Sequence, residues 1–460
     1  MFNIKCVCLC RFGLILLGCA VGGWAQMTAS ADPPKPDAAP PRQLAFPGAQ
    51  GFGAYTQGGR GGRVIAVTNL NDDGPGSLRE ACNAQGPRII VFRTGGNIRL
   101  KKYLTIREPF VTIAGQTAPG DGVCITAWSV HVETHEVVIR GLRVRPGDEK
   151  GGPKGSNQDA LAIGKKDAEV HHVILDHCSF SWAIDENLST WYPCRDITIQ
   201  WCITSEALYR SHHEKGPHSM GLLIGDHAKR VSVHHNLLAH NNYRNPQPKG
   251  DTVSETINNV IYNWGQTAIQ FSDPEGSGPS QAHIIKNVLI PGRDSAVDRG
   301  CVDIAKHMAE GTQVYLEGNQ IEGNKWPLLL KRPTNARNLS VKPVFADSGL
   351  KVDPVEKVRE QVLKEAGAIL PQRDAVDVRI VEDVRKGTGQ IIDSQKQVGG
   401  WPIYQTGEAP PDSDNDGMPD EWETRHGLDP KNADGNGDLD KDGYTNIEEY
   451  LNATDPRIKD

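Results

Sequence analysis

The chain has 460 residues, of which 38% are hydrophobic, and its 49 glycines and 30 prolines favour a loop-rich β protein over a helical bundle. The net charge of -7 is localised, because the segment from Pro411 to Asp460 holds fifteen acidic and five basic residues and leaves the preceding chain close to neutral. We therefore expect no nucleic-acid partner, and the body of the chain remains compatible with an anionic ligand.

Residues 1–25 predict a secretory signal. Basic residues flank the start of an apolar run from Phe12 to Val21, and Gly23-Trp-Ala25 supplies a cleavage site with small residues. The run is too short to predict a transmembrane span. Leu16-Leu-Gly-Cys19 also resembles a lipoprotein box, so secretion is expected either with or without a lipid anchor at Cys19. Residues 26–44 are rich in Pro, Ala and Asp and predict a disordered linker.

Residues 45–340 predict an all-β solenoid. Short alternating strands recur with a loose spacing of about 24 to 35 residues, whereas hairpin strands would recur about every 8 to 12 residues. This spacing favours a parallel β-helix over a β-sandwich. Many units have one form, in which an alternating triplet is followed by a polar turn and a second short strand. Examples are Val137 to Val144, His172 to Phe180, Asp196 to Ile203, Val231 to Leu238 and Thr256 to Tyr262.

An asparagine recurs at the polar turn of four units. Because Asn tolerates left-handed backbone angles and bonds neighbouring main chain, one Asn per coil predicts a ladder along the β-helix. The four residues are Asn236, Asn259, Asn287 and Asn319.

Two helices are expected outside the strand pattern. Ser77 to Cys82 predicts a short helix with Ser77 as N-cap and Glu80 completing a capping box, placed to cover the open end of the solenoid. Residues 341–410 are predicted to be an extension and linker, with an amphipathic helix from Val355 to Gly367. The cysteines are too widely spaced for a zinc cluster and leave open one disulfide among Cys178, Cys194 and Cys202 or buried single thiols.

Residues 411–456 predict a small segment of EF-hand-like calcium repeats. Two in-register loops present alternating oxygen ligands, a glycine at position 6 and a terminal glutamate, as a calcium ion with six to eight ligands requires. The segment resembles the thrombospondin-type-3-like and dockerin-like repeats of secreted proteins, and we expect its calcium to be structural. The expected ligands are Asp412, Asp414, Asp416, Asp420 and Glu423 in the first loop, and Asp438, Asp440, Asp442, Asn446 and Glu449 in the second.

Several motifs in order along the strand pattern resemble the pectate lyases of polysaccharide lyase family 1. They are Gly58-Gly-Arg-Gly-Gly62, Gly74-Pro-Gly-Ser-Leu-Arg-Glu80, Gly115-Gln-Thr-Ala-Pro-Gly-Asp-Gly122, Val173-Ile-Leu-Asp-His177 and Arg244-x-Pro246. The resemblance covers most of the chain from Ala45 to about Glu322. It implies a right-handed parallel β-helix, calcium dependence and β-elimination on polygalacturonate.

The chemistry implied by the resemblance requires a base and a means of neutralising the substrate carboxylate. Arg244 matches the position of the family's proposed base, and Lys215 the position of its carboxylate-binding lysine. Lys249, His177 and His235 are expected to contact substrate. The expected ligands of the catalytic calcium are Asn157, Asp159, Asp176, Asp185 and Glu186.

The chain differs from the family pattern at three positions. Ser189 and Asn157 stand where acids are usual, which would weaken calcium binding unless Glu186 compensates. Lys249 replaces a second arginine and so exchanges a bidentate group for a point charge.

Several histidines suggest a zinc site, namely His171-His172, His212-His213, His218 and His234-His235. Adjacent strand residues point to opposite faces, so we expect that such a pair does not chelate one ion and lines the β-helix or its groove instead.

The sequence thus predicts a secreted, monomeric, calcium-dependent pectate lyase that acts on de-esterified polygalacturonate. The same scaffold also fits a lyase for methylated pectin or another uronan. A hypothesis of a different class is a non-catalytic carbohydrate-binding surface protein that uses the calcium repeats for attachment.

Overall fold

The computed structural model describes residues 42–149, 158–296, 300–323, 327–330 and 337–459. The predicted signal, the Cys19 lipid site and nearly all of the predicted linker lie outside these residues. Residues 42–460 group into one compact unit. None of the helices in the described part of the chain combines the length and the apolarity that a membrane crossing requires.

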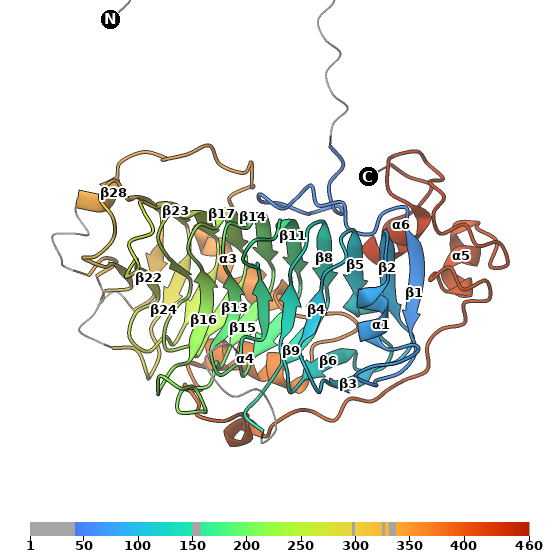
Figure 1. Ribbon diagram of the computed structural model, residues 1–460, viewed down its shortest axis with the longest axis horizontal. Helices are drawn as coiled ribbons and strands as arrows, with labels where there is room; N and C mark the ends of the chain where they lie inside the picture. The colour runs from blue at the N-terminus through green and yellow to red at the C-terminus, as the bar shows by residue number, and fades with distance from the viewer. Residues whose placement is uncertain (1–41, 150–157, 297–299, 324–326, 331–336, 460) are drawn as a thin grey trace, which may run out of the picture. The chain divides into compact units, whose positions relative to one another are not determined.

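The described residues form a parallel β-helix, as predicted (Figure 1). Sheet A contains eleven strands, all paired in parallel with their neighbours. They are β1 (Arg63–Val67), β2 (Arg88–Phe92), β5 (Val111–Ala114), β8 (Val137–Arg140), β11 (His171–Asp176), β14 (Arg195–Gln200), β17 (Lys229–His234), β20 (Val253–Ile257), β23 (Gln281–Ile285), β26 (Gln313–Glu317) and β28 (Leu339–Ser340).

Two further sheets complete each coil. Sheet B contains β3 (Gly96–Arg99), β6 (Val123–Thr126), β9 (Arg143–Arg145), β12 (Ser179–Ser181), β15 (Ile203–Ser205), β18 (Leu237–Ala239), β21 (Val260–Tyr262), β24 (Val288–Ile290) and β27 (Gln320–Ile321). Sheet C contains β4 (Leu104–Ile106), β7 (Val130–Val132), β10 (Leu161–Ile163), β13 (Glu186–Thr190), β16 (Met220–Ile224) and β19 (Gln247–Pro248), and a separate pair is formed by β22 (Ile269–Phe271) and β25 (Val302–Ile304).

The polar turn in each predicted unit is the corner between a strand of sheet A and a strand of sheet B. At this corner the predicted asparagine ladder is confirmed. The Oδ1 atom of Asn259 accepts from the backbone and side-chain amides of Asn236 at 2.9 and 3.0 Å, and Asn287 bonds Asn259 in the same way. Asn319 continues the ladder below Asn287. Side chains thus satisfy main-chain groups that turn away from the sheets.

The first predicted helix is confirmed as α1 (Leu78–Asn83), with Ser77 as its N-cap. The capping box is not formed, because the Glu80 carboxylate accepts from the backbone N–H of Gly76 at 2.7 Å. Leu78, Ala81 and Cys82 are buried in the main hydrophobic core, so α1 closes this end of the core.

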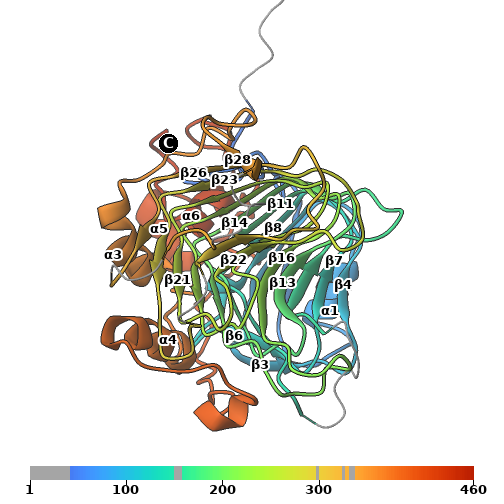
Figure 2. The same ribbon diagram turned by 90° about the vertical axis from the view of Figure 1, so that its left-hand side faces the viewer.

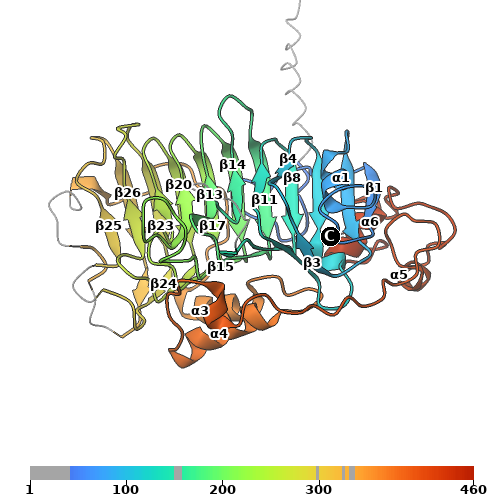
Figure 3. The ribbon, with the colours of Figure 1, turned by 60° about the horizontal axis from the view of Figure 1, so that its bottom comes forward.

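The predicted extension is more structured than a linker, and it covers sheet B. The predicted helix is confirmed as α3 (Val355–Glu365), and α4 (Ala375–Lys386) was not predicted. Both pack against side chains of β15, β18, β21 and β24, on the side away from sheet C (Figures 2 and 3). The buried guanidinium of Arg145 anchors this extension through ion pairs with Asp374 and Asp377. A 3-10 turn, η2 (Gln395–Val398), follows.

The C-terminal repeats contain α5 (Asp420–His426) and α6 (Asn446–Asn452). Their apolar residues Met418, Ile447 and Leu451 cluster with residues of β2 and β5 on the outer face of sheet A. Two ion pairs support this contact, Arg60 with Glu448 at 2.9 Å and Arg93 with Asp412 at 3.6 Å.

The six described cysteines are buried free thiols, which answers the alternative left open by the sequence. Cys178 and Cys202 place their sulfur atoms near backbone carbonyl groups of their own corners, at 3.4 Å from Asp176 O and 3.2 Å from Gln200 O.

Candidate active site

The register of sheet C collects polar residues where its strands begin. Asp159 precedes β10, Asp185 immediately precedes β13, and Arg244 precedes β19. Backbone hydrogen bonds of Asp185 N to Gln158 O (3.2 Å) and of Ala160 N to Glu186 O (3.0 Å) bring neighbouring coils together at this edge. These residues line a cavity of about 690 Å³, together with Lys215, His218 and Lys249.

Three buried carboxylates lie together in this cavity. Asp159, Asp185 and Glu186 each place an oxygen within 4.8 Å of the other two. Burial and the neighbouring Asp185 carboxylate raise the pKa of Asp159 to about 8. Like charges concentrated in a poorly solvated place are unfavourable, and a bound cation would relieve them.

Ser189 supports this carboxylate cluster. Its hydroxyl donates to Asp159 Oδ2, while Asp159 Oδ1 accepts from the backbone N–H of Glu186 at 3.3 Å. Glu186 supplies the third carboxylate of the cluster. The donor set fits a hard divalent cation with oxygen ligands and leaves coordination positions for water or substrate.

Arg244 extends over the carboxylate cluster from a left-handed backbone position with φ of 63°. Its guanidinium pairs with Glu186, and its side chain is 23% exposed. Burial lowers the pKa of Arg244, while Asp185 and Asp159 oppose that shift. A cationic group on the cavity wall is thus held against the same carboxylates that would bind a metal ion.

Two histidines that were not assigned to the site also contact it. His218 Nε2 lies 2.9 Å from Asp185 Oδ1, and His213 Nε2 lies 3.5 Å from the same oxygen. Their rings stack with centroids 3.6 Å apart. The alternation of the strands gave no signal for this contact, because it depends on the register that places the segment before β16 beside the start of β13.

The two predicted lysines differ in their surroundings. Lys215 is exposed on the loop before β16 and lines the cavity. Lys249 is buried, and its ammonium group lies 3.0 Å from Asp226 and 2.7 Å from Glu275. These two acids were not predicted, and they already neutralise the charge that Lys249 was expected to offer to substrate.

Three predicted site residues are placed elsewhere. Asp176 ends β11 in sheet A, where it bonds Arg140 and His177 at 2.9 Å and Gln200 at 2.8 Å. Although burial opposes the shift, His177 and Arg140 hold the pKa of Asp176 well below its usual range. The prediction that Asp176 shares an ion with Asp159 is therefore wrong, because Asp176 lies in sheet A and Asp159 lies at the edge of sheet C.

The two histidines predicted to contact substrate, His177 and His235, also lie away from the cavity at sheet C. His177 and His235 stack on Trp201 with ring centroids 6.0 and 4.5 Å away, and His235 Nε2 lies 3.2 Å from Asp353. None of these residues lines the cavity at sheet C. Asn157, also predicted as a ligand, lies outside the described residues.

The two C-terminal loops have matching hydrogen bonds. Gly417 N donates to Asp412 Oδ2 at 3.2 Å, and Gly443 N donates to Asp438 Oδ2 at 3.1 Å. The backbone amides two residues after Asp414, Asp416, Asp440 and Asp442 donate to the Oδ1 atoms of those side chains. The repeated backbone path confirms that the two segments form equivalent loops.

Side chains of the first loop crowd their carboxylates together. Asp412, Asp414 and Asp416 lie within 4.8 Å of one another. Burial and the neighbouring Asp416 and Asp414 raise the pKa of Glu423 to about 8. Asp420 does not join them, because its oxygens accept from the backbone and hydroxyl of Ser413 at 2.7 Å.

Two predicted ligands of the second loop, Asn446 and Glu449, make hydrogen bonds to other residues. Asn446 donates to the backbone oxygen of Asp434 at 3.0 Å, and its Oδ1 is buried without a hydrogen-bond partner among the described residues. The Glu449 carboxylate accepts from the hydroxyl of Thr454.

Comparison with known proteins identifies the family of this chain. The chain is 36% identical over 420 residues to probable pectate lyase C of Neosartorya fischeri, a match that covers 90% of this chain and 94% of the relative. The chain belongs to the pectate lyase family. Probable pectate lyase C of Aspergillus flavus is also 36% identical over 427 residues, with the same coverage. Membership makes the chain an enzyme of the polysaccharide lyase class, which excludes the non-catalytic hypothesis. No protein-family model matches the chain.

Solved structures support the pectate lyase fold. The major allergen from cedar pollen superimposes with a TM-score of 0.53 at 19% identity, covering 69% of this chain and 92% of the allergen. A pectate lyase bound to a hexasaccharide gives a TM-score of 0.52 at 16% identity, covering 72% of this chain and 99% of that chain. At these identities the likeness concerns the right-handed β-helix alone.

The raised pKa of Asp159 predicts a pH-dependent stability in protein treated with a calcium chelator. Its folded value of about 8 exceeds the ordinary value of 3.8, so the folded state retains a proton that the unfolded state releases. Stability should therefore fall as pH rises from about 4 to about 8. Asp159→Asn should reduce the loss between pH 5 and pH 8 by about 2 to 4 kcal/mol, measured by urea unfolding.

Asp73→Asn is the control. The backbone of Gly74 and the ammonium group of Lys102 lower the pKa of Asp73, so this carboxylate stays ionised at both pH values and its replacement should cost the same at each. Equal pH dependence in wild type and Asp159→Asn would show that Asp159 is not the strained group.

Proposed function

We propose that the chain is a calcium-dependent pectate lyase that cleaves de-esterified polygalacturonate by β-elimination, with Arg244 as the base. The observation that carries this proposal is the position of Arg244 beside the three buried carboxylates of Asp159, Asp185 and Glu186. An anionic uronide would meet repulsion from this cluster unless a cation lay between them. Calcium held by these residues would neutralise both the cluster and the substrate carboxylate, and so acidify the proton on the adjacent carbon.

Arg244 would remove that proton, at C5 of the uronide. The electron pair forms the bond between C4 and C5, the bond from C4 to the glycosidic oxygen breaks, and the leaving oxygen takes up a proton. A base requires a neutral guanidine, which is rare because arginine normally stays protonated. Burial favours the neutral form of Arg244, whereas Asp185 and Asp159 favour the charged form. Neutralising these carboxylates would leave the effect of burial opposed by Glu275.

Other residues would position the sugar chain. Lys215 is an exposed cation of the cavity, as are Lys165 and Lys166, and it fits a substrate carboxylate. The Lys249 ammonium is held by Asp226 and Glu275 and lies 5.2 Å from the centre of the Trp191 ring. We assign Lys249 mainly to shaping the groove around Trp191, whose ring offers a surface for stacking a sugar. Asp185 would be held in place by His218 and His213.

Arg244→Lys tests the base. Turnover of polygalacturonate should fall at least about 100-fold, because a lysine ammonium cannot reproduce the position and acidity of the guanidine group. The measurement is the absorbance rise from unsaturated uronide in the presence of calcium. Arg230→Lys is the control, since Arg230 also has a left-handed backbone and pairs with a carboxylate, Asp196, on sheet A.

The outcomes distinguish the candidate substrates. Undiminished turnover by Arg244→Lys would remove Arg244 from the mechanism. An absorbance rise on highly methylated pectin that is insensitive to chelator, with none on polygalacturonate, would favour the alternative pectin lyase. The buried carboxylate cluster argues for the first substrate, because a bound cation needs a free uronate as its counterpart.

We also propose that the two C-terminal loops bind structural calcium. Buried oxygens of Asp414, Asp416 and Glu423 have no hydrogen-bond partner among the described residues, as expected for ligands. Asp434 also raises the pKa of Glu423 and so adds negative charge near the first loop. Ions there would stabilise the cluster that Met418 and Ile447 form with sheet A.

Glu423→Gln tests this second proposal. Calcium should raise the thermal unfolding midpoint of wild type, and the variant should show a smaller rise because one charged ligand is lost. Glu421→Gln is the control on the same helix, where Glu421 is exposed and pairs with Arg425. An equal calcium response in Glu423→Gln and wild type would contradict a calcium site in the first loop.

Secretion, lipid attachment at Cys19 and the monomeric state remain predictions from the sequence.

A further inference from the structure

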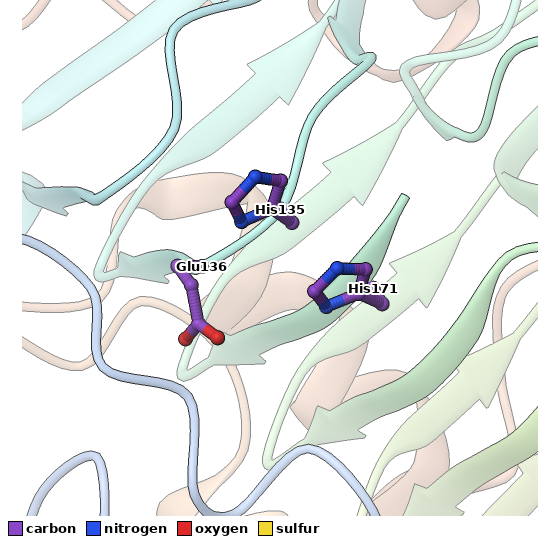
Figure 4. Close-up of side chains that lie close together, drawn as sticks. All are labelled: His135, Glu136 and His171. Atoms are coloured by element: carbon purple, nitrogen blue, oxygen red, sulfur yellow. The ribbon is translucent and has the colours of Figure 1, made fainter. Parts of the chain in front are cut away.

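A cluster of histidines lies on sheet A, apart from the carboxylate cavity on sheet C. His135 and Glu136 immediately precede β8, and His171 begins the neighbouring strand β11. The register pairs Val137 with Val173, and Glu136 N donates to His171 O at 3.2 Å. Two successive coils thus bring these side chains side by side (Figure 4).

The backbone at this edge changes the direction of neighbouring side chains. Glu136 and His172 have left-handed φ angles of 55° and 51°, so the alternation of an extended strand is broken. As a result, the Nδ1 atoms of His171 and His172 lie 2.6 Å apart. The expectation that adjacent histidines face opposite ways is therefore wrong for His171 and His172, whose imidazole rings meet.

The cluster has the approximate dimensions of a metal site that has not yet closed around its ion. Ligand atoms of His135, Glu136 and His171 all lie within 4.8 Å of one another. The rings of His135 and His171 stack at 4.7 Å with an interplanar angle of 9°. Ligands of a tetrahedral zinc ion lie about 3.4 Å apart, so rotation of the two rings about their side-chain bonds would close the set around an ion.

The ligand atom of His135 is available, whereas Nδ1 of His171 is hydrogen-bonded to Nδ1 of His172 and would have to release that bond to bind a metal ion. The Nδ1 atom of His135 is buried and has no hydrogen-bond partner among the described residues. Burial and the positive charge of Arg195 lower the pKa of His171 to about 4, which keeps its imidazole neutral, as a metal ligand must be. Glu136 Oε2 accepts from Gln57 N at 2.6 Å, a contact that fixes the carboxylate.

We propose that His135, Glu136 and His171 bind a transition-metal ion of the zinc class. Two nitrogen ligands and one carboxylate suit zinc, cobalt or nickel, whereas calcium prefers six to eight oxygens. The site is therefore chemically separate from the carboxylate cavity and from the C-terminal loops. It joins coils carrying β8 and β11 to the segment around Gln57.

Of the three ligands, Glu136 lines a small neighbouring cavity. This cavity has a volume of about 320 Å³ and is lined by Glu136, His172, Gln57, Tyr55 and two arginines, Arg42 and Arg60. Water or a small anion fits there as the remaining ligand. Arg195 opposes cation binding, although its guanidinium is paired with Asp196 at 3.0 Å, so we expect micromolar rather than nanomolar affinity.

Cobalt(II) titration of the full chain in excess calcium tests the proposal. We expect one cobalt ion per chain, a visible absorption band typical of tetrahedral coordination, and displacement by zinc. His135→Gln and His171→Gln should each weaken binding at least about 10-fold. Glu136→Gln should also weaken binding while it preserves the side-chain shape, and circular dichroism would verify that each variant is folded.

Two control variants locate the ion. His227→Gln replaces a half-exposed histidine paired with Asp251, and His218→Gln changes the histidine pair beside Asp185. Both should bind cobalt as wild type does. Loss of binding in His218→Gln, unchanged binding in all three ligand variants, or no uptake by wild type at about 100 μM cobalt would each overturn the proposal.

Discussion

The structure depends on the lateral register of parallel coils, in which each residue lies over its equivalent in the next coil. Where the repeated residue is asparagine, each side chain satisfies the corner of its neighbour, as Asn236, Asn259 and Asn287 do. Where the register brings carboxylates together it produces repulsion, as between Asp159 of one coil and Asp185 and Glu186 of the next. Stacking thus stabilises the corner between sheets A and B. At the edge of sheet C it crowds carboxylates together and so favours the binding of a cation.

Two buried aspartates show how surroundings decide between structure and chemistry. Asp176 lies between Arg140 and His177, which favour its charged form, so it serves as a fixed structural anion. Asp159 lies beside another acid, which favours its neutral form in the absence of a cation. A strongly perturbed carboxylate of the second kind marks a functional site more clearly than burial alone.

The sequence predicted the features that depend on local pattern. Alternating strands, the asparagine ladder, the Ser77 cap and the repeated Asp-rich loops each carry their own spacing, and the motif resemblance identified Arg244 with Asp159, Asp185 and Glu186. It did not show which sheet a polar residue faces, because every coil contributes strands to several sheets. Asp176, His177 and His235 were therefore assigned to a site that they do not reach. The contact of His218 with Asp185 and the closeness of His171 to His172 depend on register and left-handed corners, which alternation does not encode.

The calcium site and the role of Arg244 can be tested by a crystal structure with calcium and a short galacturonate oligomer, with the ion located by anomalous scattering. We expect an ion bound by oxygens of Asp159, Asp185 and Glu186, with a uronate carboxylate beside it and the Arg244 guanidinium within about 3.5 Å of C5 of that sugar. An ion at Asp176, or an oligomer bound away from sheet C with Arg244 still paired to Glu186, would contradict this expectation.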